Sequence, residues 1–283
     1  MKTIKKYYRL AKPGIVYGNA LYATAGFLFA SKLDAIDWQL FLAMLMGLSL
    51  IIACACVWNN WIDRDIDQYM SRTKSRSLVT GAITGREALF FSLALGIGGV
   101  VLLLFTNLLA LSLALLGVFL YVGVYTFAKR KTSFATELGS LSGAIPPLVG
   151  YVAVTGTIDL GGIILFLIVA LWQMPHFLAI ALYRKEEYAS AGIPIVPVTY
   201  GVGHTKIRIL LYVLAFASAV YALEYIRQVG IMYLVLMTIA CLWWLFLSVQ
   251  GFFTNDDRAW AKKMFLYSLV VVLFFCAALI LHK

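Results

Sequence analysis

Carboxylate and amide side chains gather at the end of one long apolar segment. Asn59, Asn60, Asp63, Asp65 and Asp67 follow this segment, and no glycine or proline interrupts them. At about 100° per residue on a helix, the two asparagines share one face with Asp63 and Asp67, whereas Asp65 points away. Two carboxylates one turn apart repel each other unless a cation lies between them. The pattern therefore predicts that Asp63 and Asp67 bind Mg²⁺, with water and substrate phosphates completing its coordination.

Basic side chains from two other segments are predicted to join these carboxylates. Arg72 and Arg76 follow the acidic motif, and Lys129 and Arg130 form a second basic cluster. Such cations bind a diphosphate and stabilise it as a leaving group. We therefore assign Arg72 and Lys129, with the two aspartates, to catalysis, and Arg76 and Arg130, with the two asparagines, to substrate binding. The alternatives are a solvated helix end whose aspartates pair with Arg64 and Arg72, and basic clusters that only anchor the chain at a membrane.

A second polar cluster follows another long apolar segment. His176, Tyr183 and Glu187 would lie on one stripe of a helix that stays regular as far as Glu187, whereas Glu186 would lie to the side. We predict that His176, Tyr183 and Arg184 bind substrate and that Glu187 contributes to a metal site. The alternative for His176 is a packing role or a hydrogen bond between helices.

These clusters require membrane helices to position them. Of the 283 residues, 63% are hydrophobic and 13% are charged, whereas a soluble domain has about 25% charged residues. We expect an all-α polytopic membrane protein, a single domain over residues 1–283, whose nine transmembrane helices surround a central cavity. The predicted helices lie near residues 14–31, 38–60, 88–106, 108–128, 138–156, 160–183, 206–224, 229–250 and 264–281.

The distribution of lysine and arginine predicts the orientation. All but three of the 23 basic residues lie on one side of the predicted topology, the exceptions being Lys32, Arg227 and Lys283. The positive-inside rule therefore predicts a cytoplasmic N-terminus, with both polar clusters on the cytoplasmic side. The net charge of +10 follows from this asymmetry and from contact with anionic lipid, so it does not indicate a nucleic-acid partner. The alternative is a cleaved signal peptide ending near Ala23–Ala25, which would leave eight helices.

Both polar clusters resemble one known family. Residues 59–67, followed by residues 72–76, are similar to the first aspartate-rich motif of the intramembrane UbiA-type prenyltransferases. Residues 140–147, 171–176 and 183–197 resemble the branch of that family called heme O synthases or protoheme IX farnesyltransferases. In two respects the chain departs from the wider family. An asparagine replaces an aspartate at position 60, and the second aspartate-rich motif is reduced to a histidine, a tyrosine and two glutamates.

The resemblance implies a function that the residues alone do not specify. It implies a Mg²⁺-dependent enzyme of the bacterial inner membrane that transfers the farnesyl group of farnesyl diphosphate to a vinyl group of heme B. The product would be heme O, and the implied protein partner is a terminal oxidase or another heme-pathway protein. The alternatives are a related enzyme with a quinone precursor or chlorophyll-like ring as acceptor and, from another class, a membrane transporter. A transporter would more naturally place charges at mid-membrane, where the apolar windows have none.

Overall fold

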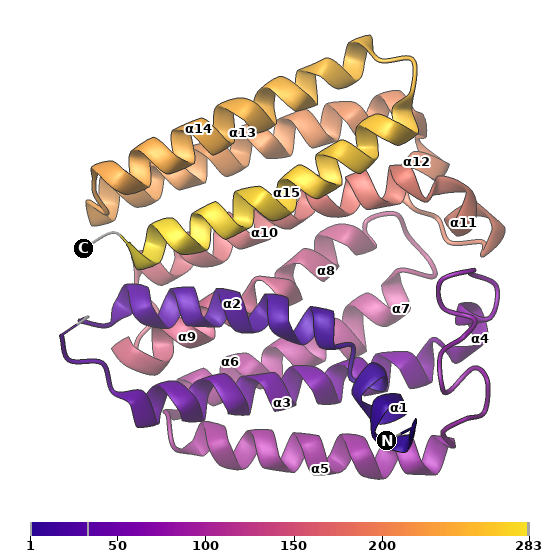
Figure 1. Cartoon of the computed structure of the whole chain (residues 1–283), viewed down its shortest axis with the longest axis horizontal. Helices are drawn as coiled ribbons and strands as arrows, with labels where there is room; N and C mark the ends of the chain where they lie inside the picture. Colours follow the sequence, from indigo (N-terminus) through magenta and orange to yellow (C-terminus); the bar gives the residue numbers. More distant parts are fainter. Residues whose placement is uncertain (1, 33, 282–283) are drawn as a thin grey trace.

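The computed structural model describes residues 2–32 and 34–281, and every regular element within them is a helix. Lys283, one of the three basic residues expected on the non-cytoplasmic side, lies outside the described residues. The long helices lie side by side as one bundle, and the short helices α4, α11 and α12 gather at the same end of it (Figure 1). The elements are α1 (Lys2–Leu10), α2 (Pro13–Ala30), α3 (Trp38–Ile62), α4 (Arg64–Asp67), α5 (Gly85–Leu104), α6 (Leu108–Val118), the π-helix η1 (Phe119–Tyr125), α7 (Thr126–Ala128), α8 (Ala135–Gly143), α9 (Ile145–Thr155), α10 (Leu160–Tyr183), α11 (Lys185–Ser190), α12 (Val196–Thr199), α13 (Gly201–Arg227), α14 (Ile231–Gln250), the 3₁₀-helix η2 (Gly251–Phe253) and α15 (Asp257–Ile280).

Eight helical segments among the described residues are long and apolar enough to cross a membrane. They correspond to α3, α5, α6 through α7, α8 with α9, α10, α13, α14 with η2, and α15. The segment α2, with 18 residues, is the ninth expected crossing and is not among these eight. The protein is therefore an all-helical multi-pass membrane protein, whereas nine crossings, a cytoplasmic N-terminus and a central cavity stay predictions.

Side-chain caps fix where several long helices begin. The carboxylate of Asp37 accepts a hydrogen bond from Leu40 N at 2.9 Å, and Asp159 accepts one from Gly162 N at 3.0 Å. Asp256 caps α15 in the same way. These caps satisfy backbone N–H groups that a helix start leaves unpaired. They also place polar residues at the ends of the apolar segments, where water and lipid headgroups can solvate them.

A close crossing joins α2 to α9. A Cβ atom on Gly26 would overlap the backbone of Pro147, and a Cβ atom on Gly150 would overlap the backbone of Ala23. Only glycine therefore allows this approach, which is typical of packed membrane helices. The transmembrane segment formed by α8 and α9 is interrupted at Ala144, and Pro146 and Pro147 follow in the first turn of α9.

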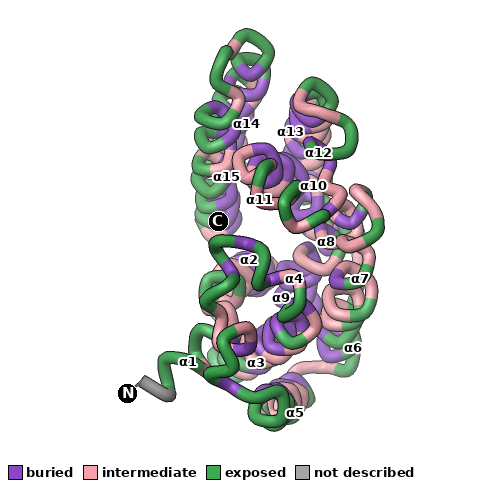
Figure 2. Tube along the Cα trace, turned by 90° about the vertical axis from the view of Figure 1, so that its right-hand side faces the viewer, coloured by how far each residue is buried: buried purple, intermediate pink, exposed green. Residues whose placement is uncertain are grey.

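Buried residues face the inside of the bundle, and exposed residues cover its outer surface (Figure 2). Many exposed side chains are large and apolar, among them Phe105, Phe119 and Leu242, which are 73%, 63% and 61% exposed. A lipid environment solvates such side chains, so their exposure fits a membrane protein rather than a soluble one.

Candidate active site

The acidic motif lies where α3 leaves the apolar bundle. Asp63 ends α3, and α4 carries the chain on to Asp67, whose N–H donates to Asp63 O at 2.9 Å. Asp63 and Asp67 are 2% and 4% exposed, whereas the side chain of Asp65 is 60% exposed. The structure thus confirms that Asp63 and Asp67 are both buried and that Asp65 is exposed, although Arg130 contacts both Asp63 and Asp65.

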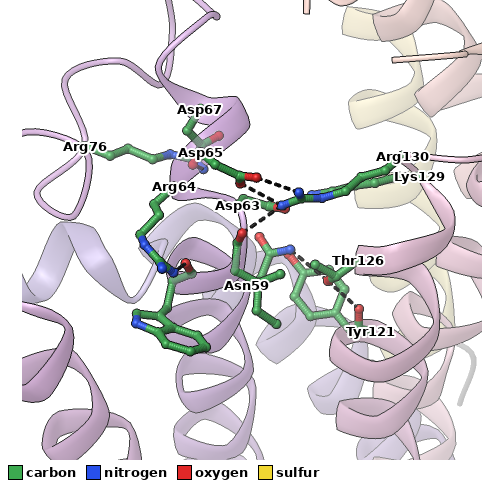
Figure 3. A network of polar contacts seen from close by, with 12 residues as sticks. Asn59, Asp63, Arg64, Asp65, Asp67, Arg76, Tyr121, Thr126, Lys129 and Arg130 are labelled. Carbon is green, nitrogen blue, oxygen red and sulfur yellow. Dashed lines mark hydrogen bonds and ion pairs between the residues drawn. The ribbon is translucent and has the colours of Figure 1, made fainter. Parts of the chain in front are cut away.

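Three cations contact these carboxylates (Figure 3). Lys129 pairs with Asp63, and Arg76 pairs with Asp67. Arg130 donates two hydrogen bonds to Asp65 at 2.7 and 2.8 Å and lies 3.5 Å from Asp63. Lys129 and Arg130 come from another transmembrane segment, so tertiary packing rather than sequence proximity brings the predicted acidic and basic clusters together.

Two arginines close to the motif in sequence have other surroundings. Arg64 donates to Trp61 O and lies over the Trp61 ring, 4.8 Å from its centroid. Arg72 is exposed and forms no ion pair among residues 2–32 and 34–281. The alternative in which the aspartates pair with Arg64 and Arg72 is therefore wrong, because Arg76, Lys129 and Arg130 occupy them instead.

A π-helix, η1, precedes the basic cluster in its transmembrane segment. Directly after η1, Thr126 donates to Tyr121 O at 2.8 Å and accepts a hydrogen bond from Asn59 Nδ2 at 2.9 Å. π-helical turns are rare and occur frequently at functional sites. Here the π-helix immediately precedes the residues that contact the acidic motif.

Lys12 is a member of the site that sequence reasoning missed. Its ammonium donates to Asn59 Oδ1, while Asn60 Nδ2 donates to Leu10 O at 2.8 Å. Lys12 adopts a left-handed backbone conformation with φ of 51°, which is uncommon for residues other than glycine. No described carboxylate lies within ion-pair distance of it. The only sequence signal is the position of Lys12 directly before a proline and an apolar window.

Burial and neighbouring charges perturb several of these groups. Removal from water lowers the pKa of Lys12 to about 8. Burial also lowers the pKa of Lys129, although the nearby Asp63 carboxylate opposes this effect. The hydrogen bonds from Arg130 hold the pKa of Asp65 below its usual value. The site contains four cations and three carboxylates, so an anionic ligand would balance its charge.

The donor atoms present fit a magnesium ion. Asn60 Oδ1 and Asp63 Oδ1 are buried and have no hydrogen-bond partner among the described residues. Mg²⁺ prefers such oxygen ligands and usually keeps water or substrate phosphates in its shell. Within residues 2–32 and 34–281, no three His, Cys, Asp or Glu side chains form a ready-made metal cluster. The protein would therefore hold the ion through oxygens of the acidic motif, together with a phosphate ligand.

The second polar cluster differs from the expected regular helix. α10 ends at Tyr183, Arg184 departs from helical geometry with φ of −111°, and α11 begins at Lys185. The expectation of one helix continuing to Glu187 is therefore wrong. The break allows Arg184 to pair with Glu187 at 3.0 Å and to lie over the Tyr183 ring. Its physical reason is that residues 184–187 are all charged and leave the apolar bundle.

His176 lies on the face of α10 that packs against α15. Its ring stacks on Trp172, with the centroids 4.9 Å apart, and its Nδ1 lies 2.7 Å from Ser268 Oγ. No hydrogen bond or ion pair between described residues joins His176 to the acidic motif. The structure thus assembles Asn59, Asp63, Asp67, Arg76, Lys129 and Arg130 into one network, together with Lys12. It leaves Arg72, His176, Tyr183, Arg184 and Glu187 outside that network.

Comparison with known proteins relates this arrangement to one family. The profile of the UbiA prenyltransferase family matches residues 20–270. A protoheme IX farnesyltransferase from Photorhabdus laumondii subsp. laumondii is 48% identical over 271 residues, which cover 95% of this chain and 92% of that protein.

Solved structures share the fold. A digeranylgeranylglyceryl phosphate synthase has a TM-score of 0.83 at 23% identity, over 100% of this chain and 99% of that one. A UbiA homologue from Archaeoglobus fulgidus with bound GPP and Mg²⁺ has a TM-score of 0.66 at 16% identity, over 97% and 99% of the two chains. At these identities the likeness shows the fold alone.

Proposed function

Because the chain belongs to the UbiA prenyltransferase family, we propose that it transfers the farnesyl group of farnesyl diphosphate to a vinyl group of heme B, giving heme O. The relative that is 48% identical and is named protoheme IX farnesyltransferase supports this choice of donor and acceptor. The structural observation that carries the proposal is the network in which Arg76, Lys129 and Arg130 pair with the aspartates of the acidic motif, two of them buried, and a fourth cation, Lys12, contacts Asn59. In such a network, a diphosphate can replace a carboxylate as the partner of a cation, so that the cation is not left buried without a counter-charge.

In the proposed reaction, the bond between farnesyl C1 and its diphosphate oxygen breaks, and the electron pair leaves with the diphosphate. Lys12, Arg76, Lys129 and Arg130 stabilise the charge on this leaving group. The π electrons of the vinyl group then form a bond to C1. Water adds to the resulting cation beside the porphyrin and loses a proton, which leaves a hydroxyethylfarnesyl substituent. The apolar helices keep other water from the farnesyl cation.

Magnesium belongs to the proposal as the cofactor. Asn60, Asp63 and Asp67 would hold the ion, and when bound it supplies further neutralisation of the leaving diphosphate. Arg76 and Lys129, which pair with the two aspartates, would turn toward the diphosphate and free carboxylate oxygens for the metal. The bound GPP and Mg²⁺ in the Archaeoglobus fulgidus homologue support this assignment.

The remaining site residues are also proposals. Arg72 lies on the loop that carries Arg76, so it is proposed to help neutralise the leaving group. His176, Tyr183 and Arg184 are proposed to serve the acceptor, and Glu187 a second metal contact. The helical stripe that suggested Glu187 is broken at Arg184, so its assignment rests on its half-buried position and its pairing with Arg184.

We also propose that the chain lies in a bacterial inner membrane with this site on the cytoplasmic face. The charge asymmetry of the loops and the bacterial origin of the 48% identical relative support this placement. A transporter function has no specific observation in its favour and does not fit membership of a prenyltransferase family.

The test uses the full chain purified in lipid nanodiscs. Farnesyl diphosphate and heme B are supplied with Mg²⁺ or with a chelator, and the extracted heme is analysed by mass spectrometry. We expect heme B to gain a farnesyl group and a hydroxyl group, only when Mg²⁺ is present. Unmodified heme, together with prenylation of a quinone precursor or a chlorophyll-like ring under the same conditions, would contradict the proposed acceptor.

A further inference from the structure

The ring of His176 is held in one orientation by residues of α10 and α15. Trp172 stacks against it, with an angle of 25° between the rings, and Phe265 lies on α15 with its centroid 5.1 Å away. Trp172 Nε1 donates to the backbone oxygen of Ser268 at 2.7 Å, and the side chain of Ser268 contacts His176 Nδ1 at the same distance. Ser268 therefore forms hydrogen bonds with both Trp172 and His176.

The hydrogen bonds of Ser268 bear on which nitrogen of His176 carries the proton, and they favour Nδ1. Ser268 Oγ lies 2.7 Å from His176 Nδ1 and 2.6 Å from Phe265 O. A hydroxyl has one hydrogen, and a carbonyl oxygen can only accept. When the Ser268 hydroxyl donates to Phe265 O, its oxygen is free to accept from His176 Nδ1–H, and this is the tautomer that we adopt; in the other tautomer Ser268 would donate to a bare Nδ1 over the same distance. Ser268 is 0% exposed, and water does not compete for this arrangement.

A neutral imidazole with its proton on Nδ1 has a bare lone pair on Nε2. No described carboxylate forms an ion pair with His176, and its aromatic neighbours favour the uncharged ring. Nε2 also has no hydrogen-bond partner among the described residues. This nitrogen can thus accept a hydrogen bond or bind a metal, but it cannot donate to a carboxylate.

We propose that His176 Nε2 ligates the iron of the heme acceptor and that Ser268 is the positioning residue that fixes the required tautomer. The inference rests on the proposed function and selects between the two roles that the sequence leaves open. A hydrogen bond to a heme propionate needs N–H on Nε2, which this tautomer lacks. Metal-binding histidines typically donate their other N–H to an oxygen, as His176 donates to Ser268.

The test measures ferric heme B binding to the full chain by its absorption and electron paramagnetic resonance spectra, without farnesyl diphosphate. We expect a histidine-ligated spectrum for the wild type, its loss in His176→Ala, and its restoration there by free imidazole. Heme dimethyl ester, which has no free propionate, should give the same dependence on His176. A dependence on His176 that disappears with the ester would identify the propionate role and overturn the proposal.

Ser268→Ala tests the positioning role. Without the acceptor for Nδ1–H, we expect heme affinity to fall by about 10- to 100-fold and the ligand-field signature to change. Ser268→Thr keeps a hydroxyl and should restore both. The matched control is Ser248→Ala, because Ser248 is equally buried and donates only within its own helix, to Leu245 O at 2.8 Å. An equal loss in Ser248→Ala, or an unchanged spectrum in Ser268→Ala, would overturn the role of Ser268.

Failure of this inference and failure of the proposed function are distinguishable. Wild-type protein that farnesylates heme while His176→Ala keeps the wild-type spectrum overturns the ligand assignment alone. Wild-type protein that binds heme through His176 but transfers no farnesyl group overturns the proposed function and supports the ligand assignment.

Discussion

Asp63 is buried between two cations of another transmembrane segment, Lys129 and Arg130. Removing one partner of a buried ion pair leaves the other charge uncompensated, which costs about 3–5 kcal/mol. Asp67 is in a similar position because Arg76 pairs with it. Asp65, in contrast, is solvated, and an exposed ion pair contributes about 0–1 kcal/mol. The three aspartates of this five-residue stretch therefore differ strongly in how much their ion pairs contribute to the stability of the protein.

This difference predicts the effects of three substitutions. Asp63→Asn and Asp67→Asn should each lower kcat/KM by roughly 100-fold or more, because they remove charge from the proposed metal site. Asp65→Asn should lower it by less than about 10-fold. The measurement is turnover as a function of Mg²⁺ concentration. Thermal unfolding of each variant distinguishes a loss of activity at the site from a loss of the fold. Equal losses at all three positions would contradict the shared buried face.

Lys12 leads to a prediction about pH. Burial lowers the pKa of its ammonium to about 8, so the free protein loses this charge as the pH rises through that value. We expect kcat/KM for farnesyl diphosphate to fall over that range, and Lys12→Arg, which stays charged, to abolish the fall. Lys12→Met should raise KM by about 10- to 100-fold. Lys32→Met, at an exposed position distant from the site, is the control and should leave KM unchanged.

Sequence reasoning identified the acidic motif and its basic partners but not Lys12. The aspartates and their cations are recognisable because such charges are rare beside apolar segments. Lys12, in contrast, has the same appearance in sequence as the anchoring lysines around it. Its role depends on a left-handed backbone conformation and on a contact to Asn59 that is 47 positions away, and neither can be read from residue types.

At the scale of elements, the sequence predicts apolar helices well and their local irregularities poorly. The window near 108–128 reads as one regular helix, whereas the structure contains the π-helix η1 within it. The predicted helix near 160–183 ends where α10 ends, but the irregular backbone at Arg184, which breaks the stripe to Glu187, is absent from the pattern. A long-range contact, from Asn59 to Thr126, accompanies the π-helix, whereas a local ion pair between Arg184 and Glu187 accompanies the break after Tyr183. Helical periodicity contains no information about such contacts.

The π-helix predicts a role for Thr126, which connects η1 to Asn59. Thr126→Val keeps the shape of the side chain but removes the acceptor for Asn59 Nδ2 and the donor to Tyr121 O. We expect a loss of stability of about 1–3 kcal/mol and a raised KM for farnesyl diphosphate, because Asn59 also orients Lys12. Thr126→Ser keeps the hydroxyl and should resemble the wild type. Chemical unfolding and substrate saturation provide the two measurements, and full activity in Thr126→Val would exclude the connection.

At the scale of the whole molecule, the position of α2 in the bundle indicates whether the chain crosses the membrane eight or nine times. α2 is about 27 Å long at 1.5 Å per residue, close to the thickness of the hydrocarbon core. It contacts α3, α9 and α15 within the bundle, and its glycine contacts with α9 leave no space between the two helices. We therefore predict that α2 crosses with the helices it packs along, although its polar residues make it less apolar than the other eight.

Nine crossings predict that reporter fusions after Lys32 and after Lys131 lie on opposite sides of the membrane. They also place an N-terminal tag in the cytoplasm, because the basic loops fix the orientation of the later helices independently of α2. Eight crossings, with α2 cleaved or lying at the surface, would put Lys32 on the same side as any N-terminal tag that remains. A fusion at Asn107 is the control, since it should report the same side as Lys32 in the nine-helix topology. The reporters at Lys32 and Lys131 are separated by α3, α5 and α6 through α7 in either topology. The result that would show that α2 does not cross is therefore an N-terminal tag on the same side of the membrane as the Lys32 reporter.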